Sequence, residues 1–226
     1  DDITRPGVYI NYCDHVIMPG EHFPKHYNTI SSKNLYFGSP KYDVQIDDEE
    51  TYKKYNLNKD EKKALLIFPR RRDVYKIDLE KLYRIVRDMG YKIIVKTRGK
   101  DPAEDIFRGD YYFEDDSWYP HTTMELIKVS DFIINFSSTT IKECVLLKKP
   151  LINFHIKPYD LSKTMGDLYT LDYCKNLDVR VNSKEIKDAV NYITSQDLTS
   201  AYKEAEEKFL FEPNDVSKKI LDFVLA

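Results

Sequence analysis

Apolar runs and helical repeats alternate along most of the chain. Residues 64–69 form a short, continuous apolar run that ends in proline, as is typical of a parallel strand buried on both faces. Residues 79–89 carry apolar side chains at helical spacing, and Gly90 predicts the end of that helix. The same criteria predict strands at 91–96, 111–113, 132–135, 151–155 and 178–181, and helices at 122–129, 183–194, 198–211 and 214–225.

Strands separated by helical segments predict an α/β fold with a doubly wound, Rossmann-like parallel sheet and helices at the C-terminus. Residues 1–60 follow a different pattern. They suggest strands at 8–10 and 15–18, turns at 19–20 and 38–40, and one helix near 49–55 within a charged surface connection. In doubly wound sheets, ligands bind beyond the carboxyl ends of the strands, and several polar clusters of this chain fall at such ends.

Composition narrows the class of protein. The chain has 226 residues, 42% of them hydrophobic, which is enough for one large domain with a substantial core. Its net charge of −3 argues against a dedicated nucleic-acid binder, which normally has a basic excess. The three cysteines, Cys13, Cys144 and Cys174, are far apart and match no disulfide frame or zinc motif, so we expect reduced thiols in a cytosolic protein. No signal peptide or membrane-spanning run is visible.

The candidate chemistry is richest after the strand at 132–135. Four hydroxyl residues, Ser137, Ser138, Thr139 and Thr140, stand where this strand passes into a short helix. A helix start offers unpaired N–H groups and a positive dipole end, which suit a phosphate. Glu143 is expected about one and a half turns into the helix, within reach of a ribose diol. The alternative is that Ser137 or Ser138 is simply a helix N-cap.

Cationic residues follow two other predicted strands. Arg70, Arg71 and Arg72 come directly after the strand at 64–69, and Arg98 follows the strand at 91–96. Guanidinium groups bind phosphate oxygens in bidentate fashion, so these loops favour a diphosphate in one shared crevice. The alternative for each is a solvated loop, with a salt bridge to Asp73 in the first case.

Two histidines are candidates for contact with a substrate. His121 precedes the helix predicted at 122–129, and His155 ends the strand at 151–155; either is equally consistent with a structural histidine. No metal site is predicted, because the remaining histidines match no ligand spacing. There is no glycine-rich dinucleotide fingerprint and no P-loop, and no cofactor is predicted.

The order of these motifs resembles the C-terminal, nucleotide-binding half of GT-B-fold transferases. The element at 38–43 resembles the Gly-Asn-Pro-x-x-Asp linker of CDP-glycerol glycerophosphotransferases and nonhydrolysing UDP-GlcNAc 2-epimerases. Phe136-Ser137-Ser138 matches the Tyr-Ser-Ser phosphate turn of the former family. The stretch from Ser138 to Glu143 aligns with the Ser-Gly-Gly-x-x-Glu segment of the latter, which places Glu143 at the ribose position.

The resemblance covers residues 35–160 and has departures. Thr97-Arg98-Gly99 replaces the His-Pro of the glycerophosphotransferases, and Thr139-Thr140 replaces the paired glycines of the epimerases. In both families the acceptor site or the acid and base residues lie largely in an N-terminal domain. The catalytic residues of this chain therefore remain unassigned.

The resemblance implies a domain order and a set of partners. Residues 1–45 would be a remnant of the N-terminal domain and linker, 46–200 the nucleotide-diphosphate-binding domain, and 201–226 helices that pack back on it. The partners would be a UDP- or CDP-type donor and a glycan or lipid-linked acceptor, at the inner face of the membrane. The implied activity is transfer of a glycosyl or glycerophosphoryl group to a surface polysaccharide. A nucleotide-sugar 2-epimerase and a non-catalytic nucleotide-binding module are the alternatives.

Overall fold

The structure is a computed structural model, and it describes residues 14–18, 33–69, 71–99, 101–115, 121–155, 170–180, 182–210 and 214–226. By its internal contacts the chain forms two compact units. One comprises Asp1–Gln45 together with Ser200–Ala226, and the other is Ile46–Thr199. The larger unit carries the sheet predicted from the sequence, and each unit is described by itself below.

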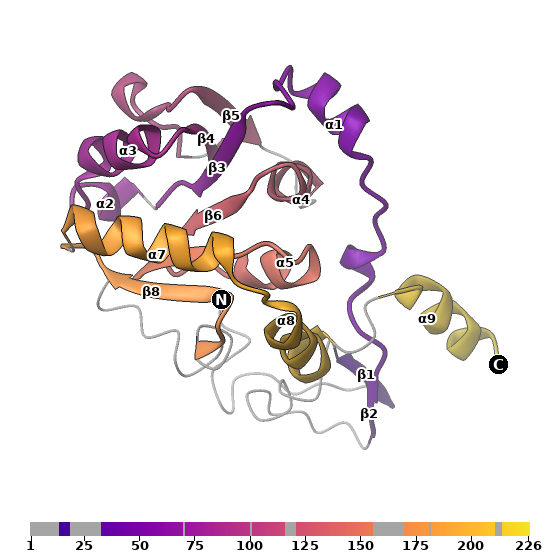
Figure 1. Cartoon of the computed structure of the whole chain (residues 1–226). Coiled ribbons are helices and arrows are strands. Elements are labelled where there is room, and N and C mark those ends of the chain that lie inside the picture. Colours follow the sequence, from indigo (N-terminus) through magenta and orange to yellow (C-terminus); the bar gives the residue numbers. More distant parts are fainter. Residues whose placement is uncertain are drawn as a thin grey trace. The chain divides into compact units, whose positions relative to one another are not determined.

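The larger unit is built on a six-stranded parallel sheet, which confirms the predicted fold class (Figure 1). Its strands are β3 (Lys62–Ile67), β4 (Tyr91–Arg98), β5 (Tyr111–Asp115), β6 (Phe132–Asn135), β7 (Leu151–His155) and β8 (Cys174–Asp178). Their spatial order is β5-β4-β3-β6-β7-β8. Counted along the chain this is the Rossmann order, and its topological switch point lies between β3 and β6.

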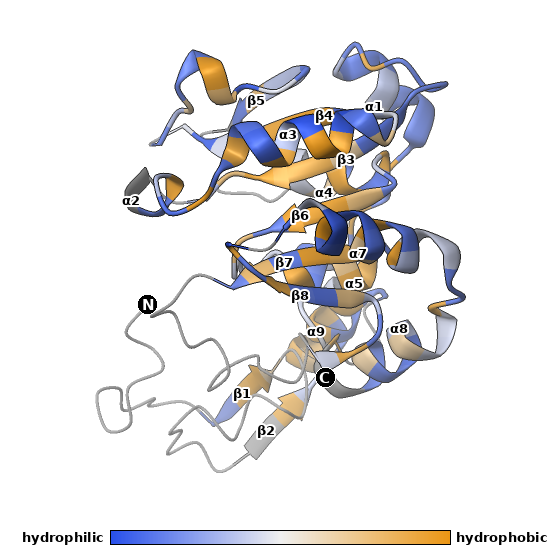
Figure 2. Ribbon diagram, turned by 60° about the vertical axis from the view of Figure 1, so that its left-hand side comes forward, coloured by the Kyte–Doolittle hydropathy of each residue, from blue (hydrophilic) through white to orange (hydrophobic). Residues whose placement is uncertain are grey.

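Helices cover both faces of this sheet. Figure 1 shows α3 (Leu79–Asp88) and α7 (Ser183–Ser195) on one face, with α4 (His121–Lys128) and α5 (Ile141–Leu146) on the other. The main core lies between the sheet and the helices α3 and α7. The hydropathy colouring of Figure 2 shows that the central strands are apolar and that these helices have one polar side. Such two-sided cover explains the continuous apolar runs within β3, at residues 64–67, and within β6, at residues 132–134.

The two core helices have defined starts. The Asp78 carboxylate accepts a hydrogen bond from the Lys81 N–H at 3.0 Å and thereby caps α3. Asn182 and Glu185 form a reciprocal capping box at the start of α7. Gly90 has φ +86°, the left-handed conformation that ends α3 before β4.

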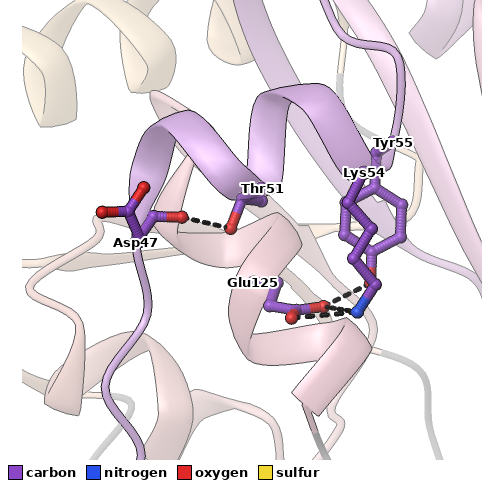
Figure 3. A network of polar contacts seen from close by, with 5 residues as sticks. All are labelled: Asp47, Thr51, Lys54, Tyr55 and Glu125. Atoms are coloured by element: carbon purple, nitrogen blue, oxygen red, sulfur yellow. Dashed lines mark hydrogen bonds and ion pairs between the residues drawn. The ribbon is translucent and has the colours of Figure 1, made fainter.

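A polar network joins α1 (Asp48–Lys54) to α4 (Figure 3). The Glu125 carboxylate accepts hydrogen bonds from Lys54 Nζ at 2.8 Å and from the Tyr55 hydroxyl. Burial and the bond to Glu125 raise the pKa of Tyr55, so the hydroxyl stays protonated and continues to donate. At the other end of α1, the Thr51 hydroxyl donates to the Asp47 carbonyl. The network therefore holds the predicted connecting helix against the sheet domain.

The smaller unit contains a short parallel pair of strands, β1 (His15–Met18) and β2 (Lys33–Tyr36). Its other elements are η2 (Pro40–Tyr42), α8 (Thr199–Ala205), η5 (Glu206–Leu210) and α9 (Val216–Leu225). Asp43, the last residue of the linker-like motif, accepts hydrogen bonds from Val216 N at 3.0 Å and Ser217 N at 2.5 Å. Burial opposes ionisation of Asp43, but the bonds from Ser217 and Val216 outweigh it and lower its pKa. Asp43 therefore acts as an N-cap for α9 from a distant part of the sequence.

The sequence located most elements, with two corrections. The last strand is β8 at Cys174–Asp178 and not 178–181, because an edge strand with alternating exposure carries no continuous apolar run. The helix after β6 begins at Ile141 and not near Ser138, because the hydroxyl residues form a turn first. The short helix α2 (Arg71–Val74) and strand β2 were not predicted, and the strand expected at 8–10 lies outside the described residues.

Candidate functional site at the carboxyl edge of the sheet

The candidate site lies where β3 and β6 end side by side. These two strands are hydrogen-bonded neighbours, and their following segments leave in opposite directions along the sheet, toward β4 and toward β7. A crevice at such a reversal of strand order is the usual ligand site of doubly wound sheets. The hydroxyl residues follow β6 and the arginines follow β3, so the fold brings the two predicted clusters to the same edge.

Ser137 is held in an uncommon backbone conformation. Its φ is +53°, a left-handed value that non-glycine residues seldom adopt. The Ser137 N–H donates a 2.8 Å hydrogen bond to Asn153 Oδ1. Its hydroxyl is buried and has no hydrogen-bond partner among the described residues. Backbone strain and an unsatisfied buried hydroxyl at one position are features that cluster at functional sites.

The next three residues form a compact hydroxyl turn. The hydroxyls of Ser138 and Thr140 are 2.9 Å apart and hydrogen-bonded to each other. Thr140, and neither Ser137 nor Ser138, occupies the N-cap position of α5, and its side chain makes no capping bond. The Ser138 hydroxyl accepts a 3.4 Å hydrogen bond from the Thr140 N–H. Thr139 is exposed, and its N–H has no partner within the described part of the chain. The turn thus presents one N–H group and several hydroxyls.

The later start of α5 changes the expected position of Glu143. This helix has six residues, and Glu143 is its third, within the first turn and not one and a half turns in. Its side chain is buried, with 6% exposed. So short a helix supplies only a small dipole. Any attraction for phosphate must therefore come from the turn and from nearby cations.

A ladder of three asparagines supports the turn, and the sequence reasoning missed it. Asn135, Asn153 and Asn176 occupy matching register positions on β6, β7 and β8. The Asn135 amide donates to Asn153 Oδ1 at 3.3 Å, and the Asn153 amide donates to Asn176 Oδ1 at 3.0 Å. The available signal was an asparagine within each of two buried apolar strands, where polar residues need partners. Because Asn153 also binds the Ser137 N–H, the ladder fixes the left-handed turn.

The structure describes the side chain of only one of the four candidate arginines, Arg98. Arg70 lies outside the described residues. Arg71 and Arg72 belong to α2, a short helix in place of the expected open loop, and their side chains are not described. Asp73 is buried and pairs with Lys76 at 2.6 Å. Arg98 is the exposed last residue of β4 and forms no ion pair with any described residue.

The two histidines occupy different environments. His155 is the exposed last residue of β7, so it lies at the same edge of the sheet as the hydroxyl turn. His121 is the first residue of α4, and its side chain is outside the described part. Among the residues that the structure describes, no group of histidines, cysteines and carboxylates is suited to hold a metal ion.

Cys144 and Cys174 are free and buried, whereas Cys13 lies outside the described residues. Burial raises the pKa of the Cys144 thiol well above its usual value, and the neighbouring Glu143 adds to the increase. Burial likewise raises the pKa of Cys174. Both groups therefore stay protonated near neutral pH, and neither is suited to act as a nucleophile.

Comparison with known proteins gives matches among solved structures alone. No protein-family model matches the sequence, and no curated protein matches it. A structure of the wall teichoic acid polymerase TagF soaked with CDPG matches 94% of this chain with a TM-score of 0.66 and 20% identity. The UDP-GlcNAc 2-epimerase of Methanocaldococcus jannaschii, in complex with UDP-GlcNAc and UDP, matches 94% of the chain with a TM-score of 0.57 and 14% identity.

The chain has a GT-B-like fold. A third structure, the glycotransferase of kitacinnamycin, matches 88% of the chain with a TM-score of 0.53 and 12% identity. The resemblance drawn from the sequence motifs is therefore confirmed for the fold. This chain spans little more than half of these structures, namely 56% of the polymerase, 61% of the epimerase and 53% of the glycotransferase. Within the described residues, none of its helices has the length and hydropathy needed to cross a membrane.

Proposed function

We propose that the larger unit binds a nucleoside-diphosphate-activated donor at the edge between β3 and β6. The observation that carries this proposal is the strained hydroxyl turn at the switch point, with the buried Ser137 hydroxyl lacking a described partner. Structures of the same fold were solved with CDPG or with UDP-GlcNAc and UDP, which supports a ligand of this class.

In the proposed complex, the diphosphate rests on the hydroxyl turn. The Thr139 N–H and the Ser137 hydroxyl donate to phosphate oxygens. Of the mutually bonded Ser138 and Thr140 hydroxyls, the one that accepts the bond between them keeps its hydrogen for a phosphate oxygen. Arg70 or Arg72, with Arg98 nearby, compensates the negative charge, and each charge-assisted contact contributes roughly 1.5–3 kcal/mol. Glu143 accepts hydrogen bonds from the ribose diol, and His121 and His155 are candidates for contact with the transferred group.

The proposed reaction is transfer of a glycosyl or glycerophosphoryl group to a surface-polysaccharide or glycan acceptor. The same arginines that bind the donor would stabilise the nucleoside diphosphate as it leaves, which is the electrostatic role required when no metal takes part. The acceptor, and peripheral association with the inner face of a membrane, belong to this proposal. The general base is not assigned to a residue of this chain.

A binding experiment tests the donor site. Calorimetry should show that UDP or CDP binds far more tightly than uridine or cytidine, because the phosphates meet the hydroxyl turn and the arginines. Equal affinities for the diphosphates and the nucleosides would refute the site.

A product analysis separates the two reactions that the similar structures suggest. An epimerase of the same fold would convert a labelled UDP-sugar into its 2-epimer without an acceptor. The structural similarity to the M. jannaschii epimerase is the reason for this test. A transferase would release labelled product only when an acceptor is supplied. If the full-length protein binds the nucleotide but carries out neither reaction, the result would favour a non-catalytic nucleotide-binding module.

A further inference from the structure

A cavity lies on the other face of the sheet from the hydroxyl turn. It has a volume of about 260 Å³ and is formed between the starts of α3 and α7, the end of β7 and the turn after β8. All of these elements belong to the larger unit. The proposed donor site uses none of the residues that line this cavity.

The separation from the donor site follows from the alternation of side chains along β7. Asn153 points to the face where it binds the Ser137 N–H, and its neighbour Phe154 points to the opposite face and lines the cavity. Phe154 also stacks on Phe136, with ring centroids 5.5 Å apart. Both rings belong to the core between the sheet and helices α3 and α7, on the face that carries the cavity.

The lining of the cavity has two chemical parts. Its inner wall is apolar and is provided by nearly buried side chains of Ile77, Leu82, Phe154 and Ile186. Its charged part consists of three cations, Lys76, Lys81 and Arg180, and one carboxylate, Asp78. Since cations outnumber carboxylates, the cavity favours an anion that carries an apolar group.

Two of the cations are available to a ligand. Lys76 is already paired with Asp73, and the Asp78 carboxylate is occupied as the cap of α3. Lys81 and Arg180 form no ion pair with any residue that the structure describes, although they come from different elements and meet at one cavity. Both adjoining helices are already capped by side chains, so the positive character arises from these two groups and not from helix ends.

We propose that this cavity binds a small apolar compound that bears one phosphate or carboxylate group. Lys81 and Arg180 bind the anionic group, and the apolar body packs against Phe154, Ile77 and Ile186. The volume is slightly below the range of about 300–1,000 Å³ usual for small-molecule sites, so the ligand is compact. The site is distinct from the donor crevice and does not depend on the proposed transferase activity.

The test follows the methyl resonances of Ile77 and Ile186 by NMR in the full chain, with phenyl phosphate as the probe. Saturable shifts of both signals are expected, and phenol and inorganic phosphate should each bind about tenfold more weakly, because each supplies half of the required chemistry. Lys81→Ala and Arg180→Ala should each weaken phenyl phosphate by about tenfold. Lys187→Ala is the matched control, since it removes the same charge from an exposed position next to Ile186 and should leave the affinity unchanged.

Three results would overturn the proposal. The first is that phenyl phosphate leaves both isoleucine signals unmoved at millimolar concentration. The second is that it binds the Lys81→Ala, Arg180→Ala double variant as well as it binds the original chain. Displacement of the probe by UDP would show that the cavity is part of the donor crevice. Failure of UDP to bind anywhere would refute the donor site alone, because the phenyl phosphate signals are read independently.

Discussion

The two halves of the sheet's carboxyl edge are built from different chemistry. On the β6–β8 side, neutral hydroxyl and amide groups are fixed by hydrogen bonds, and Asn135 and Asn153 are each only 1% exposed. On the β3–β5 side the sequence supplies arginines. Of these, Arg98 has a described side chain, which is exposed and forms no ion pair with a described residue. The neutral half therefore determines geometry, whereas the cationic half supplies charge, which Arg98 carries on an exposed side chain.

This contrast has an energetic consequence. Changes in the neutral half should reduce both folding stability and ligand binding, because buried groups lose their partners. Changes in the cationic half should reduce binding alone, and that contribution should weaken as salt is added, since exposed charges are screened. The following substitutions test this division, from the largest expected effect to the smallest.

Asn153→Ala should have the largest effect. It removes the acceptor of the Ser137 N–H and the central member of the ladder, leaving buried donors without partners at about 1–3 kcal/mol each. Chemical denaturation should show a loss of about 3 kcal/mol in the free energy of unfolding, together with loss of UDP or CDP binding. Asn176→Ala is the control at the exposed end of the ladder, and it should lose much less stability. Equal losses in the two variants would contradict a special role for Asn153.

Arg70→Ala and Arg72→Ala test the cationic half. At least one of them should weaken diphosphate binding by about tenfold, equivalent to about 1.4 kcal/mol, without changing the free energy of unfolding. The affinity of that variant should also depend less steeply on salt concentration. Arg84→Ala, at an exposed position on α3, is the matched control for loss of one charge. Normal binding by both variants would leave the three arginines as a solvated surface.

At this edge of the sheet, the sequence predicted the strands correctly where apolar residues are continuously buried. It did not predict the contacts that side chains make between neighbouring strands. Strands β6 and β7 occur at the predicted residues, because both are mostly apolar and buried, with polar residues only at Asn135 in β6 and at Asn153 and His155 in β7. The start of α5 was misplaced because four consecutive hydroxyl residues look like a helix cap, whereas Ser137 adopts a left-handed turn. The asparagine ladder depends on strand register, which a single sequence does not reveal.

Glu143→Gln should have a moderate and selective effect. If the carboxylate accepts both ribose hydroxyls, glutamine offers fewer acceptor positions in nearly the same shape. Binding of a ribonucleoside diphosphate should weaken several-fold, and its advantage over the 2′-deoxy form should narrow, as measured by parallel calorimetric titrations. Equal affinities of the original chain for ribo and deoxyribo diphosphates would remove Glu143 from the site, while the phosphate contacts would still stand.

Ser137→Gly should have the smallest effect on stability and separates backbone strain from hydroxyl chemistry. Glycine relieves the strain of φ +53°, which is of order 1 kcal/mol, but it also gains freedom in the unfolded chain of about 0.4–1 kcal/mol. The two terms oppose each other, so the free energy of unfolding should change by less than about 1 kcal/mol. Diphosphate binding should nevertheless weaken, because the buried hydroxyl that would turn about χ1 toward a phosphate oxygen is gone.

Ser137→Ala completes this test, since it removes the hydroxyl and keeps the strained backbone. The two variants should lose affinity for UDP or CDP equally, by up to about tenfold for one hydrogen bond to a charged group. A loss in the glycine variant alone would mean that the rigid left-handed turn matters and the hydroxyl does not. If both variants bind UDP or CDP fully, the neutral half contributes to binding through Ser138, Thr139 and Thr140, and not through Ser137, which the asparagine ladder holds in place.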